Sequence, residues 1–177
     1  MAAALTPLLA SAAGVLLVAG AAKLRSPGGA SAALQTLGLP AARFVVRGVA
    51  ACEIALGVAC LLDPSTVIAC LVAAIYAMFA LVALLLAHRS SSCGCFGDPE
   101  MPASPMQSVL SLMLSVVALT AAIAGAHGSA WMLDRPIAGG VALIAAIAGS
   151  AYGLVLAYTR LPAAWVAWAP SGSGSPR

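Results

Sequence analysis

Residues 44–87 read FVVRGVAACEIALGVACLLDPSTVIACLVAAIYAMFALVALLLA, two apolar runs joined by the polar triplet Asp63-Pro64-Ser65. Each run is close to the roughly 20 apolar residues with which a helix crosses the hydrocarbon core of a bilayer. Backbone groups cannot stay unpaired in lipid, so each run must be a helix. The triplet has the composition of a tight turn, which predicts an antiparallel pair of membrane-spanning helices.

Three similar runs complete the pattern and predict an all-α, polytopic membrane protein with a single membrane domain over residues 1–160. The chain of 177 residues is 63% hydrophobic and 7% charged, too little charge to cover a soluble domain of this length. Its partner is therefore the lipid bilayer, and a net charge of +3 is too small to indicate nucleic acid. The predicted spans are Leu5–Ala22, Phe44–Leu62, Val67–Ala87, Met106–Ala126 and Pro136–Tyr158.

The ends and connections of the chain carry further signals. The first span could instead be a cleaved signal peptide, but it lacks the basic start that such peptides have. Ala30–Leu37 lies between Pro/Gly pairs and predicts a short interfacial or re-entrant helix. Residues 161–177 combine Trp165 and Trp168 with a Ser/Gly tail, which predicts an interfacial segment followed by a flexible end.

The distribution of Lys and Arg predicts how the protein is oriented in the cell membrane, the inner membrane where there are two. Seven of the eight basic residues flank connections on one side of a five-span protein, and Arg135 alone lies on the other. Positive charge favours the cytoplasmic side. We therefore expect an outside N-terminus, an inside C-terminus and a cytoplasmic position for the connection between the third and fourth spans.

That connection contains the motif Cys93-Gly94-Cys95-Phe96-Gly97. Two accessible thiols one residue apart can exchange with a partner disulfide, and Gly94 gives the backbone freedom to close a small, strained and therefore labile ring. Cys93 and Cys95 are thus the candidate redox pair. Three alternatives stay open. The two cysteines could have no role, or they could form a structural disulfide in a non-catalytic assembly or scaffold subunit. They could also form a metal site with His88, which lacks an evident fourth ligand.

Three motifs resemble the MauE (methylamine-utilisation) family of integral membrane proteins, within the DoxX-like superfamily. They are G-x-x-K-L-x-x-P at residues 20–27, E-x-x-x-G at residues 53–57 and C-x-C-F-G at residues 93–97. The similarity covers residues 14–125. The cysteine motif is its specific part, because the other two recur across the superfamily.

The resemblance implies a four-helix DoxX-like bundle with a fifth transmembrane helix added to it. It also implies thiol–disulfide redox support, or maturation, of a thioredoxin-like or disulfide-containing protein partner. The client of the founding family member is matured outside the cytoplasm, which conflicts with the side that the charges predict for Cys93 and Cys95. Whether the chain is itself an oxidoreductase stays open. No cofactor motif is evident, although a cavity in the bundle could hold a quinone.

Glu53 lies near the middle of the second span, where a charged carboxylate costs about 2.5–3.5 kcal/mol on insertion scales. We expect it to face the bundle interior. It could serve as a proton acceptor for thiol chemistry. It could instead have a structural role, in an interhelical hydrogen bond or in an ion pair with Lys23 or Arg47, and the structural role is favoured. For Lys23 itself we expect the side chain to extend to the headgroups.

Three cysteines and one glycine motif within the spans complete the candidates. Cys60 and Cys70 are about equally far from the turn at Ser65 and could form a second redox pair, although we favour unrelated buried thiols. We expect Cys52 to be a packing residue. Residues 149–153 form G-x-x-x-G, which allows close helix contact. We expect this motif to dock the fifth helix on the core, with dimerisation as the alternative.

Overall fold

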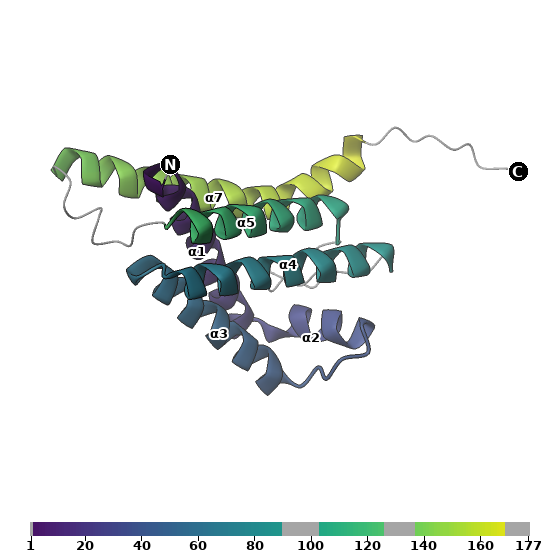
Figure 1. Ribbon diagram of the computed structural model, residues 1–177. Helices are drawn as coiled ribbons and strands as arrows, with labels where there is room; N and C mark the ends of the chain where they lie inside the picture. Colours follow the sequence, from purple (N-terminus) through teal and green to yellow (C-terminus); the bar gives the residue numbers. More distant parts are fainter. Residues whose placement is uncertain (1, 90–102, 126–136, 169–177) are drawn as a thin grey trace, which may run out of the picture.

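The computed structural model describes residues 2–89, 103–125 and 137–168, and these residues form a helical bundle (Figure 1). Five helices are long and apolar enough to cross a membrane, in agreement with the five predicted spans. The motif with Cys93 and Cys95 lies outside the described residues. The helices are α1 (Ala2–Arg25), α2 (Pro27–Thr36), α3 (Arg43–Leu62), α4 (Thr66–His88), α5 (Pro105–Ala124) and α7 (Ile137–Trp168).

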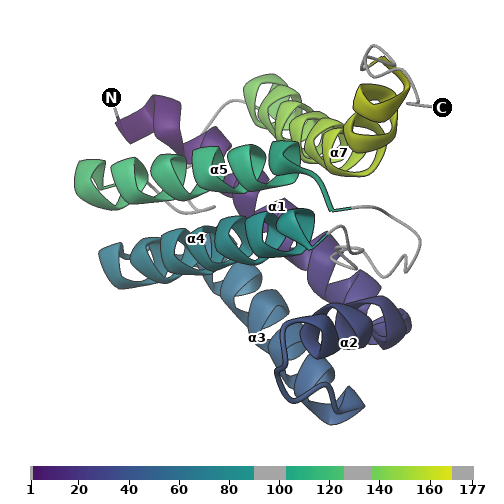
Figure 2. The same ribbon diagram turned by 90° about the vertical axis from the view of Figure 1, so that its right-hand side faces the viewer.

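Helices α3 and α4 form the predicted antiparallel hairpin. The turn lies between Leu62 and Thr66, and the Ser65 hydroxyl caps α4 by accepting a hydrogen bond from the Ile68 backbone N–H at 3.4 Å. From this turn the two helices diverge, so that they are close at one end and separated at the other (Figures 1 and 2). Their separation leaves room for α2. This helix confirms the short helix predicted around residues 30–37.

Helices α4 and α5 run side by side and antiparallel (Figure 2). Two serines of α5 fix their register. Ser108 donates to the Ala80 carbonyl at 2.7 Å, and Ser115 donates to the Ala73 carbonyl at 2.8 Å. Seven residues separate the donors and seven separate the acceptors, so the same face of α5 follows α4 over two turns. Such interhelical hydrogen bonds replace the hydrophobic driving force that lipid does not provide.

Helix α1 is the most deeply placed of the five spans. Leu9, Leu16 and several alanines of this helix are almost fully buried, because α3, α5 and α7 all pack against it. Tyr76 of α4 also reaches it, since its hydroxyl donates to the Ala12 carbonyl at 2.6 Å. The segment that could be a cleaved signal peptide is therefore an integral part of the core.

Helix α7 lies on the outside of the bundle and continues beyond Tyr158 to Trp168, where the sequence predicts an interfacial segment. One face of it contacts the core. Ser150 forms a hydrogen bond with Ser11, and Ala151 packs against Gly14. An added Cβ at Gly149 or Gly153 would meet no atom within 4 Å. The prediction that this glycine motif docks the helix on its own core is wrong, because the helix contacts the bundle through the adjoining face.

Candidate functional site

Positive charge gathers at one end of the bundle, where α1, α4 and α7 end and α3 and α5 begin. Tyr158 marks the position of α7 there, because its carbonyl accepts a hydrogen bond from the Gln107 side chain near the start of α5. The connection with the cysteine motif leaves α4 and enters α5 at this same end. The described cations here are Lys23, Arg25, Arg43, Arg47, Arg89 and Arg160.

Just inside this end, Lys23 of α1 and Glu53 of α3 form a buried ion pair. The ammonium donates to both carboxylate oxygens, at 2.6 and 2.7 Å. The side chains are 8% and 1% exposed, respectively. The single ammonium neutralises the carboxylate in a low-dielectric environment, where burying either charge alone would cost much free energy.

Glycines let the two backbones approach closely enough for this pair to form. An added Cβ at Gly20 would lie 2.8 Å from an Ile54 side-chain atom and 2.9 Å from the Ala50 carbonyl oxygen. An added Cβ at Gly57 would lie 3.1 Å from the Ala13 carbonyl oxygen. Gly20 precedes Lys23 by three residues, and Gly57 follows Glu53 by four, so each glycine shares a helix face with its charged neighbour. The motifs G-x-x-K and E-x-x-x-G are thus two halves of one contact.

The structure corrects the expectation that Lys23 extends to the headgroups. Its side chain turns inward, because Glu53 is within reach and because the face of Phe79 lies 4.7 Å from the ammonium. An aromatic face attracts a cation through its quadrupole, most strongly where water is excluded. Of the two partners suggested for Glu53, the structure selects Lys23. Ion pairing of Glu53 is confirmed, and its use as a proton acceptor stays a prediction.

A second set of polar side chains, from α5 and α7, lines a cavity that Lys23 also lines. The Ser111 and Tyr158 hydroxyls are 2.9 Å apart, and the Gln107 side chain donates to the Tyr158 carbonyl at 3.2 Å. Lys23 lines the same small cavity of about 20 Å³ as these three residues. That volume is enough for one water-sized molecule. Lys23 thus faces the polar side chains of α5 and α7 across this cavity.

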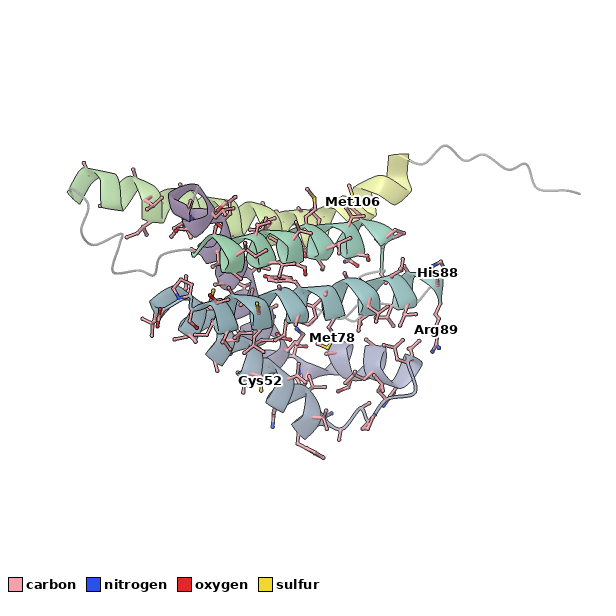
Figure 3. The ribbon with its side chains drawn as sticks, viewed as in Figure 1. Cys52, Met78, His88, Arg89 and Met106 are labelled. Atoms are coloured by element: carbon pink, nitrogen blue, oxygen red, sulfur yellow. The ribbon has the colours of Figure 1, made fainter. Side chains whose placement is uncertain are left out.

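Both ends of the connection are held in place. The Arg89 guanidinium donates to the Thr36 carbonyl and ties the end of α4 to α2 (Figure 3). At the other end, Ser104 and Gln107 form a capping box that starts α5. Since Cys93 and Cys95 lie outside the described residues, their roles stay a prediction. The role of His88, the last residue of α4, stays a prediction as well. Within the described parts of the chain, no three His, Cys, Asp or Glu side chains converge as metal ligands do.

The cysteines of the spans are all free thiols in this structure. Cys60 is buried and Cys70 is exposed, so these two do not form a pair here and differ from the expected two buried thiols. Cys52 is exposed as well, which corrects its assignment to packing. The exposure of Cys52 follows from helix geometry. Glu53 faces inward, and successive residues point about 100° apart around the helix axis.

Sequence reasoning missed Phe79, Gln107, Ser111 and Tyr158 as neighbours of the ion pair. A signal was present for part of this set. Ser104, Ser108, Ser111 and Ser115 recur at helical spacing in a span that is otherwise apolar, and such a row of hydroxyls indicates a face that contacts other helices. Phe79 and Tyr158 gave no comparable signal, because aromatic residues are common in any apolar span.

The chain belongs to the methylamine utilisation protein MauE family, whose family model matches residues 1–128. The matched part includes both halves of the α1–α3 contact and the cysteine motif, and it ends before α7. Comparisons with curated proteins and with solved structures gave no match.

Proposed function

We propose that this protein supports maturation of a partner protein by thiol–disulfide exchange at the membrane, in a methylamine-utilisation accessory role, with Cys93 and Cys95 as the exchanging pair. The observation that carries the proposal is that the connection with both cysteines is bracketed by two fixed helix ends. Arg89 is tied to α2, and Ser104 caps α5. The connection with the two cysteines therefore leaves and re-enters the bundle at anchored helix ends. The family match supports the accessory role.

The exchange needs no group other than sulfur. A thiolate of the pair attacks a disulfide of the partner, one partner thiolate leaves, and a mixed disulfide joins the two proteins. The second cysteine then attacks the mixed disulfide, so that the loop becomes oxidised and the partner leaves with two thiols. Two electrons have passed to the partner. The reverse sequence oxidises a partner dithiol, and a thioredoxin-like protein resets the pair in either direction.

The experiment is thiol trapping in intact cells with Cys52, Cys60 and Cys70 replaced by alanine. Maleimide labelling before and after reduction reports whether Cys93 and Cys95 occur in both oxidation states. We expect a reversible mixture, and loss of client maturation in the double-serine variant. Loop thiols that are always reduced, together with a fully active double-serine variant, would exclude the proposal.

A non-catalytic assembly role is the second candidate, and the closed ion pair favours it. Lys23 and Glu53 satisfy each other at 2.6 and 2.7 Å, the geometry of a fixed structural contact. A scaffold would tolerate serine at both loop cysteines, so the same experiment separates the two functions. Metal analysis of the purified protein before and after thiol alkylation tests the metal-handling alternative.

We further propose that the loop faces the cytoplasm, because the described cations gather at the end of the bundle from which it extends. The positive-inside tendency supports this side. A membrane-impermeable maleimide added to intact cells tests it. We expect no labelling of Cys93 and Cys95 unless the membrane is opened, and labelling in intact cells would place the loop outside.

A further inference from the structure

An apolar cavity of about 190 Å³ lies between α2, α3 and α4, and the ion pair contributes to its wall. Alanine and leucine side chains of α2, including Ala33, line this cavity, and so does Val46 of α3. Lys23, Glu53 and Phe79 contribute to the same wall. The ion pair is thus the polar feature of an otherwise hydrocarbon-like chamber.

A larger and more open groove of about 630 Å³ lies between the diverging helices α3 and α4. It is lined by Cys52 and Leu56 on α3 and by Leu71 and Ile75 on α4. Met78 belongs to both linings and marks the junction, and it lies between α4 and α2 (Figure 3). Cys52, Leu71 and Met78 are all exposed, so the groove faces the lipid. The chamber thus contains the polar ion pair, and the groove that shares Met78 with it is apolar.

The charges in the chamber restrict what can bind there. Glu53 already neutralises Lys23, so a phosphate or carboxylate headgroup would find no uncompensated cation in the chamber. Lys23 has three N–H donors, and within the described residues its hydrogen-bond acceptors are the two Glu53 oxygens alone. The third N–H remains for a neutral acceptor such as a carbonyl oxygen. The Phe79 ring, whose face lies 4.7 Å from this ammonium, lines the same wall.

From this chemistry we infer that the chamber and groove bind a neutral amphiphile with a carbonyl-bearing ring and a long apolar tail, the chemistry of a membrane quinone. The ring lies against Lys23 and Phe79, and the tail leaves past Met78 along the groove.

A role for this ligand in electron transfer rests on the proposed function. Oxidation of the Cys93 and Cys95 thiols to a disulfide releases two electrons and two protons, and one quinone takes up both to become a quinol. The binding site itself is argued without the loop.

The binding test uses a variant in which Cys52 is the single thiol, with Cys93 and Cys95 replaced by serine, so that its result is independent of the loop chemistry. The protein is placed in phosphatidylcholine nanodiscs, and labelling of Cys52 by an apolar maleimide is followed with increasing decylubiquinone. We expect a saturable slowing, about tenfold when the quinone reaches roughly ten times its Kd. The matched control has Cys70 as the single thiol, which is exposed on α4 but does not line the groove. Its labelling rate should not change.

Two further arms test the ring and the chamber. Decylbenzene has a ring and tail but no carbonyl, and it should protect Cys52 much less than decylubiquinone. Ala33→Phe fills the chamber and should abolish protection, whereas Ala32→Phe, on the exposed face of α2, should retain it. Equal protection by decylbenzene would overturn the inference in favour of a simple hydrocarbon occupant. Unaltered protection in Ala33→Phe, or no protection in the parent, would overturn it outright.

Discussion

Gly20 and Gly57 lie at the crossing of α1 and α3, whereas Gly149 and Gly153 lie on the outer face of α7. At the first pair an added methyl group would meet backbone carbonyls at 2.9 and 3.1 Å, and at the second it would meet nothing within 4 Å. The α1–α3 crossing also holds a buried ion pair, while α7 is attached by hydrogen bonds between uncharged groups and by the packing of Ala151 against Gly14. Glycine spacing alone therefore does not identify a helix contact, and an intramembrane charge beside the glycine is the more informative signal.

Breaking the ion pair should lower the stability of the protein more than any other change at these two regions. Lys23→Met keeps the length of the side chain but leaves the Glu53 carboxylate buried without its partner. We expect the free energy of unfolding to fall by about 3–5 kcal/mol, as when one member of a buried pair is removed. Steric-trapping measurements of unfolding in bicelles would determine it.

The control for this change is the double variant Lys23→Met with Glu53→Leu. Removing both charges leaves no orphaned group, so most of the lost stability should return. If the single variant is no less stable than the double variant, Glu53 does not depend on Lys23, and the crossing owes its stability to packing alone.

The two glycine pairs should respond to alanine with opposite signs. Gly20→Ala forces the Ala50 carbonyl away and should destabilise the protein by about 1–3 kcal/mol, the usual cost of overpacking. Gly153→Ala meets open space and should stabilise its helix by up to about 1 kcal/mol, since glycine is the poorer helix former. The same unfolding measurement decides this, and equal effects at both sites would contradict the contrast.

The fold was largely predictable from sequence, because lipid permits few structures to an apolar run and the turn at Asp63-Pro64-Ser65 is explicit. The inward position of Glu53 followed from the cost of burying charge. The orientation of Lys23 did not follow, since a lysine near a helix end can reach either the headgroups or a buried acid. That choice depends on the distance to Glu53, which the glycine contact sets in three dimensions. The exposure of Gly149 depends in the same way on which face of α7 meets α1.

The smallest effect is expected where α7 joins the bundle. Tyr158→Phe and Ser111→Ala each remove one side of the 2.9 Å hydroxyl contact between α7 and α5. Interhelical hydrogen bonds in membranes contribute about 0.6 kcal/mol on average, because the unfolded helices find other partners. A double-mutant cycle of these two changes should therefore give a coupling energy of that size. A coupling energy as large as that between Lys23 and Glu53 would mean that α7 belongs to the core as fully as α3 does. The two regions would then differ in the kind of interaction that holds them and not in its contribution to stability.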